Sequence, residues 1–225
     1  MTKIVYVPYK KPKAIVYPAS DGKPLAETDI HLFEVVSLFF LLKDYFSKRN
    51  DVYVASNNFI YYTEGNIKDR FSPDIYVVFG IPSHMRRTYN IWEEGKPPSV
   101  VFELTSRKTK AKDLGPKKEL CERLGVREYF LHDPEADYLK PPLQGFRLNE
   151  GRYCPINVDE SGAIVSETLG VKLCLEGKRL ALFNAATGER IWRTEDARKR
   201  AEAEAEQANA EIARLREENE RLKNR

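Results

Sequence analysis

The sequence predicts an α/β domain in which helices cover the faces of a mixed β-sheet, followed by a long C-terminal helix. A segment at residues 28–48 carries apolar side chains at near-helical spacing, and short runs rich in β-branched and aromatic residues follow it. From about residue 194 onward the chain consists almost entirely of Ala, Glu, Arg, Lys, Gln and Leu. An order of helix, strands, helix and strand is typical of a mixed sheet with helices on its faces.

The first predicted helix, at residues 28–48, follows an irregular arm that is rich in Pro, Lys and Tyr. Thr28 or Asp29 can cap its N-terminus. Its apolar side chains cover much of the helix circumference, so we expect the helix to lie in the core. His31 and Glu34 are polar exceptions within this apolar helix, and both are therefore residues of interest.

The sheet is predicted from five short apolar runs that are separated by glycine, proline and charged turns. These runs lie at residues 52–54, 59–62, 75–79, 99–104 and 128–132. Two of them, 75–79 and 99–104, are almost wholly apolar, as is typical of strands that are covered on both faces. A second helix is predicted at about 114–124, where Asp113 can cap the first turn and Gly125 suits the C-terminal end.

The C-terminal part of the chain divides into a small β-rich extension from about residue 138 and a helical segment at 194–225. A heptad fits the helical segment, with Ile212 and Asn219 at a positions and Leu215 at a d position. A single Asn at an a position favours a parallel, in-register dimer. We therefore expect a homodimer held by a C-terminal coiled coil, and the alternative is a solvated monomeric helix.

The composition argues against several classes of protein. A hydrophobic fraction of 42% is typical of a folded chain, and the formal net charge of +3 is too small to indicate a strongly basic nucleic-acid-binding domain. Three scattered cysteines indicate no disulfide framework and favour a reducing compartment. The apolar run at 32–42 contains Glu34 and is shorter than a membrane span, and the N-terminus shows no signal peptide. We therefore expect a cytoplasmic protein without a membrane segment.

The candidate chemistry lies between residues 73 and 118. Asp74 directly precedes the strand at 75–79, and Glu103 lies near the end of the strand at 99–104. Burial of such carboxylates costs several kcal/mol unless a cation compensates their charge, and either a divalent metal or a lysine can do so. A basic segment follows Glu103 and continues into the next predicted helix; its lysines are Lys108, Lys110, Lys112, Lys117 and Lys118.

Carboxylates beside a lysine are what the hydrolysis of a phosphodiester needs. Magnesium is typically held by one or two carboxylates together with phosphate oxygens of the substrate. The metal lowers the pKa of its bound water and neutralises charge on the phosphate. A nearby lysine can orient or deprotonate the attacking water, or stabilise the developing charge. Each residue alone is also explained by a turn, a surface ion pair or a solvated loop, so the residues by themselves leave the function open.

Five motifs stand in a fixed order along this region. They are Pro73-Asp74 before a strand, Glu103-Leu104-Thr105-Ser106 at the end of a strand, Asp113 to Lys117 on a helix, Gly125-Val126-Arg127-Glu128-Tyr129, and Asp133-Pro134. In this order they resemble the Uma2 family of restriction endonucleases (DUF820), which belongs to the PD-(D/E)XK nuclease superfamily. The resemblance is dense here and extends more loosely to Asp21-Gly22 and to residues 26–31.

The resemblance implies a restriction-endonuclease-like domain at residues 1–193 that hydrolyses phosphodiester bonds in DNA with Mg²⁺, or with Mn²⁺ in its place. Asp74 and Glu103 would bind the metal, and Lys117 would assist the water or the phosphate. Lys108 and Lys118 compete with Lys117 for that role. Together with the predicted coiled coil, the resemblance implies a homodimeric endonuclease.

The chain departs from the family and superfamily pattern in three places. In one of them, the common Glu-Leu-x-Asp-Gly-Glu entry is reduced to Ala19-Ser20-Asp21-Gly22-Lys23. The superfamily's lysine normally stands two residues after the glutamate, where this chain has Thr105, and family members often carry a Tyr at the position of Cys121. An accessory acid on the first helix would suit the superfamily, but the sequence does not choose between Glu27 and Glu34. His31 matches a histidine common in the family. It fits a structural role, as a helix-entry residue hydrogen-bonded to the backbone, about as well as a catalytic role.

Two other functions stay open at the level of the sequence. A nucleic-acid-binding protein that has lost catalysis would fit the displaced lysine and the low net charge, and it would bind DNA without metal-dependent cleavage. An interaction protein would use the globular domain as a head and the coiled coil to recruit partners. Deletion of residues 194–225 would then abolish partner binding.

Overall fold

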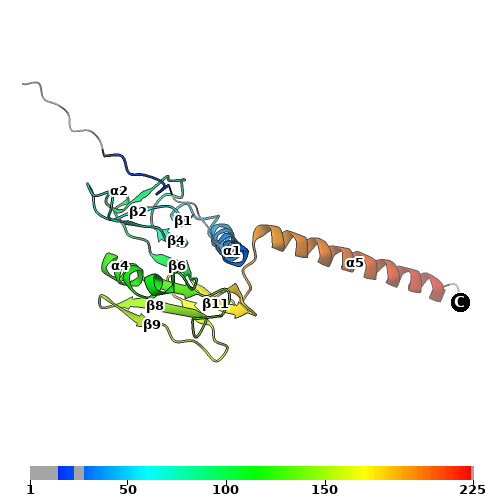
Figure 1. Ribbon diagram of the computed structural model, residues 1–225. Helices are drawn as coiled ribbons and strands as arrows, with labels where there is room; N and C mark the ends of the chain where they lie inside the picture. Colours follow the sequence, from blue (N-terminus) through cyan, green and yellow to red (C-terminus); the bar gives the residue numbers. More distant parts are fainter. Residues whose placement is uncertain (1–14, 23–27, 224–225) are drawn as a thin grey trace, which may run out of the picture.

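The computed structural model describes residues 15–22 and 28–223, and a six-stranded sheet lies at the centre of its globular part (Figure 1). The strands in spatial order are β1 (Val52–Ser56), β4 (Ile75–Phe79), β6 (Val100–Leu104), β7 (Glu128–His132), β8 (Leu143–Asn149) and β9 (Arg152–Pro155). Strands β6 and β7 run parallel, and the other neighbouring pairs are antiparallel. The predicted class, a mixed α/β sheet with helices, is confirmed.

Helix α1 (Asp29–Tyr45) covers one face of this sheet. The Thr28 side chain caps the helix by accepting a hydrogen bond from the His31 amide at 3.2 Å, so Thr28 is the cap of the two that the sequence suggested. The core-facing side chains of α1 recur every three or four residues, which is the spacing of one helix face. They are Val35, Leu38 and Leu42.

Two short helices, α3 (Lys110–Leu114) and α4 (Pro116–Leu124), lie against the other face. The helix predicted at about 114–124 corresponds to α4. The predicted cap is wrong, because Gly115 is the N-cap residue of α4 and Asp113 belongs to α3. The predicted C-terminal end is confirmed. Gly125 has a φ of 81° and is the C-cap in the left-handed conformation, which glycine adopts without a steric penalty.

Each face of the central sheet carries its own apolar cluster. Along β6, Val100 and Phe102 belong to the cluster that includes α1 side chains, whereas Val101 belongs to the cluster that includes α4 side chains. Successive residues of a strand point to opposite faces, so Glu103 shares the face of Val101. The Glu103 carboxylate is thereby directed towards α4, the helix that carries Lys117.

Two three-stranded sheets complete the globular part. The first has the order β3-β2-β5, with β2 (Ile60–Tyr61), β3 (Arg70–Phe71) and β5 (Tyr89–Asn90), and β5 leads into the short helix α2 (Ile91–Glu94). The second comprises β10 (Ile164–Ser166), β11 (Val171–Glu176) and β12 (Arg179–Asn184). The β-rich segment after residue 138 therefore adds β8 and β9 to the central sheet and forms a second sheet of its own.

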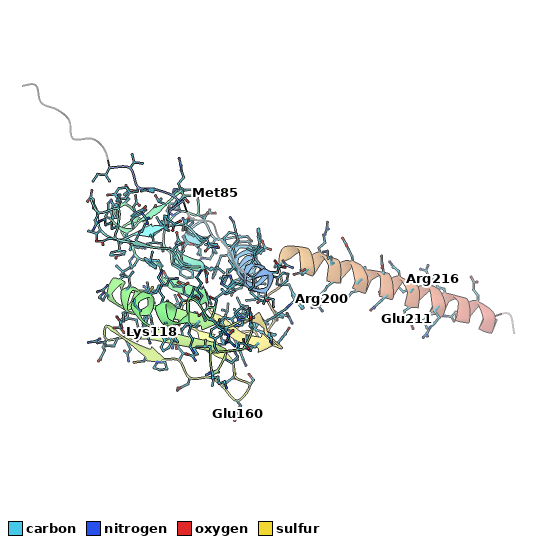
Figure 2. The ribbon with its side chains drawn as sticks, in the orientation of Figure 1. Met85, Lys118, Glu160, Arg200, Glu211 and Arg216 are labelled. Carbon is cyan, nitrogen blue, oxygen red and sulfur yellow. The ribbon has the colours of Figure 1, made fainter. Side chains whose placement is uncertain are left out.

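Helix α5 (Thr194–Lys223) projects away from the globular part (Figure 1). The Trp192 ring precedes it and lies under two guanidinium groups, that of Arg190 at 4.1 Å and that of Arg200 at 4.5 Å from the ring centroid. This stacking ties the first turns of α5 to the chain before them. Figure 2 shows side chains along α5, among them Glu211, extending from the helix on more than one side. In the described part of the chain, no helix combines the length and apolarity that crossing a membrane requires.

Candidate active site

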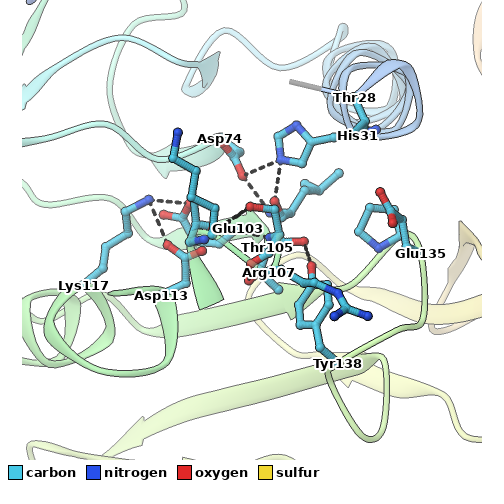
Figure 3. Close-up of a pocket in the computed structure, with 15 residues that line it drawn as sticks. Thr28, His31, Asp74, Glu103, Thr105, Arg107, Asp113, Lys117, Glu135 and Tyr138 are labelled. Atoms are coloured by element: carbon cyan, nitrogen blue, oxygen red, sulfur yellow. Dashed lines mark hydrogen bonds and ion pairs between the residues drawn. The ribbon is translucent and has the colours of Figure 1, made fainter. Parts of the chain in front are cut away.

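Asp74 and Glu103 face each other across two neighbouring strands of the central sheet. Asp74 directly precedes β4, and Glu103 is the fourth residue of β6. The antiparallel register pairs Ile75 with Phe102, so continuation of that register by one residue sets Asp74 opposite Glu103. Figure 3 shows both carboxylates directed into one pocket. The structure thus brings together the two residues that the sequence singled out as metal ligands.

The backbone of Leu104 is held by two of the side chains around this pocket. Its amide donates a hydrogen bond to Asp74 Oδ2 at 2.7 Å, and its carbonyl oxygen lies 2.5 Å from His31 Nε2. His31 Nε2 also lies 3.7 Å from Asp74 Oδ2. Helix α1 therefore reaches the end of β6 through His31, and the residue that follows Glu103 is fixed on both of its backbone polar groups.

Lys117 lies in the first turn of α4 and contacts both acidic side chains on its side of the pocket. Its Nζ lies 2.6 Å from Glu103 Oε2 and 3.4 Å from Asp113 Oδ1. Pro116 at the start of α4 suits a helical first turn, because proline has no amide hydrogen to leave unsatisfied there. The helix thus begins where Lys117 can reach back to the end of β6.

Burial and mutual contact shift the pKa values of this group. Burial raises the pKa of Glu103 to about 8, against the opposing effect of the Lys117 ammonium. Burial alone would lower the pKa of Lys117, but the charges of Glu103 and Asp113 outweigh it and hold that pKa above its usual value. Lys117 is consequently protonated at neutral pH and acts as a hydrogen-bond donor and positive charge.

The pocket around these residues has a volume of about 710 Å³. One wall is the loop that follows β6, whose Ser106 and Thr109 bond to each other through side chains and amides. Arg107 and Lys108 belong to the same loop and line the pocket. Tyr138 also lines the pocket and donates its hydroxyl hydrogen to the Thr105 carbonyl at the start of this loop. Positive side chains therefore line the pocket above the carboxylates of its base. Glu135 lines it as well, and the Arg107 guanidinium lies 2.9 Å from Asp137 Oδ2.

Several residues that the sequence offered as site candidates lie outside the pocket or make other contacts. Lys118 Nζ lies over the Phe146 ring, 3.9 Å from its centroid, and Glu34 Oε2 accepts a hydrogen bond from the Leu180 amide at 3.3 Å. Thr105, at the usual lysine position, is buried and carries no charge. The remaining alternative, Glu27, lies outside the described residues.

Asp113 is a pocket residue that sequence reasoning named only as a helix cap and as part of a motif. It is 2% exposed and lies beside Lys117, and its Oδ1 accepts no hydrogen bond from a described residue. The spacing Asp113 to Lys117 was the available signal, because residues four apart on a helix lie on one face. A glycine between them breaks the helix, yet the two side chains still meet.

A divalent ion fits the residues present at the pocket base. Among the described residues, no cluster of three or more His, Cys, Asp or Glu side chains is arranged to hold a metal. Magnesium needs only one or two protein carboxylates when the substrate supplies phosphate oxygens, and Asp74 and Glu103 are such a pair. Glu103 Oε1 is buried and makes no hydrogen bond within the described chain, as expected of an oxygen available to a cation.

Residues 16–181 match the model of the Uma2 family, which carries the description "Putative restriction endonuclease". The chain belongs to the Uma2 family. The matched region contains both strands of the pocket base and helix α4, so the resemblance noted from the motifs is confirmed.

One solved structure similar to this Uma2 protein comes from Anabaena variabilis ATCC 29413 and is described as a putative nuclease belonging to DUF820. It shares 12% sequence identity with the chain, with a TM-score of 0.48, and the match covers 67% of this chain and 81% of that one. The curated proteins contain no match.

Proposed function

We propose that this Uma2 protein is a divalent-metal-dependent endonuclease that hydrolyses phosphodiester bonds in DNA. The observation that carries the proposal is the convergence of Asp74, Glu103 and Lys117 at the base of one pocket. Mg²⁺ is the proposed ion and Mn²⁺ its substitute, and Asp74 and Glu103 are the groups that would hold it. When bound, the ion supplies a water of lowered pKa and neutralises charge on the phosphate.

The charge of the pocket base supports a divalent ion. When ionised, Asp74, Glu103 and Asp113 carry three negative charges, and Lys117 carries one positive charge, which leaves a net charge of −2. Three of these four side chains are nearly buried, and buried charge is costly unless it is compensated. A doubly charged cation would neutralise the group with Glu103 ionised, whereas a monovalent one would not. Because the pKa of Glu103 is about 8 without an ion, binding at neutral pH would release its proton.

Lys117 would stabilise charge instead of accepting a proton. Its pKa lies above the usual value because two carboxylates surround it, so deprotonation at neutral pH is unfavourable. A protonated lysine donates hydrogen bonds to a phosphate oxygen or to the water that attacks it. Lys117 takes over, from helix α4, the role for which Thr105 has no suitable group.

His31 and Asp74 would set the geometry of the pocket base. Their contacts with the Leu104 backbone fix the end of β6, and a carboxylate on a fixed backbone needs less ordering when it binds an ion. In the loop after β6, Arg107 and Lys108 lie where the phosphates of a nucleic acid would pass. These positive side chains support nucleic acid as the substrate class, and DNA is the substrate we propose.

The test combines calorimetry with a cleavage assay on the wild type, Glu103→Gln and the control Glu119→Gln. Glu119 is exposed on α4, so its substitution removes an acid from the same helix without touching the pocket. The wild type and the control should bind Mg²⁺ and nick supercoiled plasmid DNA, and Glu103→Gln should do neither while keeping its circular dichroism spectrum. Absence of both binding and cleavage in the wild type would refute the proposal, and DNA binding without cleavage would favour the inactive binding protein.

A further inference from the structure

Helix α1 has a second apolar face that points away from the sheet. Its four outward side chains fall within one side of the helix at 100° per residue, opposite the core-facing side chains. They are Leu32 (49% exposed), Phe33 (45%), Val36 (40%) and Phe40 (47%). Single exposed apolar residues are ordinary, but a contiguous apolar stripe along a helix is typical of a surface that binds another protein.

Neighbouring side chains leave most of this stripe open. The Arg179 guanidinium lies 4.6 Å from the Phe33 ring centroid, at the end of the stripe nearest β12. The middle of the stripe, at Val36 and Phe40, keeps the exposed fractions given above. Within the described chain, the core therefore buries only one of the two apolar faces of α1.

Helix α5 is a second element whose apolar side chains are exposed. Ile212 is 47% exposed and Leu215 is 48% exposed, and they occupy successive a and d positions of the heptad. An isolated helix is only marginally stable in water, and a coiled-coil partner would bury these positions. The earlier heptads offer mainly alanine, at Ala201, Ala205 and Ala208, so pairing of α5 alone buries little apolar area.

Helix α5 begins at the end of the globular part where α1 lies, and Ile212 and Leu215 stand farther along it. Ile191, three residues before α5, packs against the apolar cluster to which α1 contributes, and the Trp192 stacking holds the first turns of α5. Figure 1 shows α5 leaving the globular part beside α1. A parallel pairing of two α5 helices would therefore bring two globular parts together at this end, with their α1 helices next to the shared axis.

We propose that the outward face of α1 and helix α5 together form one homodimer interface, with a second copy of this chain as the occupant. Four large apolar side chains at these exposures offer roughly 300–400 Å² per copy, against about 800 Å² in a stable interface. The α1 stripe and the alanine-rich α5 each offer less apolar area than a stable interface buries. Because both lie on one chain, a single dimer would bury both of them. This inference does not depend on the chemistry of the pocket.

The test is sedimentation equilibrium on the full chain, with the wild type, Val36→Glu/Phe40→Glu and the control Met85→Glu. Met85 is 89% exposed and lies on another part of the surface (Figure 2). The wild type and the control should be dimers, and the double variant should have a dissociation constant raised at least about tenfold. A monomeric wild type, or a dimer weakened by Leu215→Asp but not by the α1 substitutions, would overturn the proposal.

A second measurement does not rely on the double variant being folded. Val36→Cys places a thiol at the middle of the stripe, so the dimer should give a covalent pair with a short bis-maleimide reagent. The wild type, which keeps the exposed Cys154, is the control for other cross-links. A cross-linked dimer that forms only with Val36→Cys supports the proposal, and equal cross-linking in both proteins contradicts it.

Discussion

Lys117 Nζ lies 2.6 Å from Glu103 Oε2, and this contact joins the first turn of α4 to the end of β6. The lysine side chain is 10% exposed and the glutamate side chain 1%, so water screens the pair little. Asp113 adds a second carboxylate beside the same ammonium. Lys117 therefore compensates buried negative charge from two sides, and its loss would affect stability as well as chemistry.

Lys117→Met should lower the free energy of unfolding by roughly 3 kcal/mol at neutral pH, because it leaves buried carboxylates without their cation. Addition of Mg²⁺ should restore part of this loss if the ion binds between the same carboxylates. Urea unfolding followed by circular dichroism, with and without Mg²⁺, measures both effects.

Lys118→Met is the matched control for this prediction. Lys118 is the next residue of α4, but its ammonium lies over the Phe146 ring instead of a carboxylate, so a loss below about 1 kcal/mol is expected. Equal losses in the two variants, or a Lys117→Met protein as stable as the wild type, would show that the ion pair contributes nothing net to folding.

His31→Ala should weaken Mg²⁺ binding about tenfold, since partners that orient a ligating segment typically contribute at this level. The physical reason is the contact between His31 Nε2 and the Leu104 carbonyl, directly after Glu103. His31→Gln retains a donor at the side-chain end and should lose less. Calorimetry on both variants checks this, with the exposed His84→Ala as control, and an unchanged affinity in His31→Ala would contradict it.

The strands that carry the candidate site could be predicted from the sequence because they are short, apolar and sharply bounded. Asp74 and Glu103 each stand at the end of such a run, where a carboxylate interrupts the apolar pattern. Pairing of the two strands was not visible in the pattern. The pairing follows from long-range packing, because β4 and β6 are neighbours in the central sheet whereas β2 belongs to a separate sheet.

Sequence reasoning assigned Asp113 the wrong role and left the role of Glu34 open, for different reasons. Asp113 satisfies the local rule for a helix cap, but a break at Gly115 starts α4 later and directs Asp113 into the pocket. Glu34 fits an accessory acid by position, but it faces β12, where it bonds the Leu180 amide. For Glu34, a contact with an element distant in the sequence decided the role of the side chain, and local propensity carries no information about such contacts. For Asp113, the deciding feature is local, because its partner Lys117 lies only four residues away, beyond the break at Gly115.

His132 should make the protein sensitive to mild acid. Its side chain is buried at 2% exposure, and burial lowers its pKa from 6.5 to about 4. The unfolded chain takes up this proton near pH 6.5 and the folded chain only near pH 4, so stability is lost as the pH falls between these values. The expected contribution is about 2 kcal/mol at pH 5 relative to pH 7.

The measurement compares urea midpoints at pH 7 and pH 5 for the wild type and His132→Leu, and the variant should lose less stability on acidification. Glu103 acts in the opposite direction, because a raised carboxyl pKa gives stability that grows as the pH falls through about 8. The difference between the two proteins removes this shared effect. His84→Leu, at an exposed site, should behave as the wild type, and identical pH dependence in all three would contradict the prediction.

Asp113→Asn should reduce cleavage of plasmid DNA about tenfold at saturating Mg²⁺ while leaving the Mg²⁺ dissociation constant nearly unchanged. Asp113 contacts Lys117 and not Asp74, so it is expected to hold the ammonium in place when Glu103 turns to an ion. Without the Asp113 carboxylate, the Lys117 ammonium would contact Glu103 alone. It would then move with Glu103 instead of staying near the phosphate. Glu119→Gln, an exposed acid on α4, controls for loss of charge. If Asp113→Asn abolished ion binding to the same extent as Glu103→Gln, Asp113 would be a ligand and not the residue that positions Lys117.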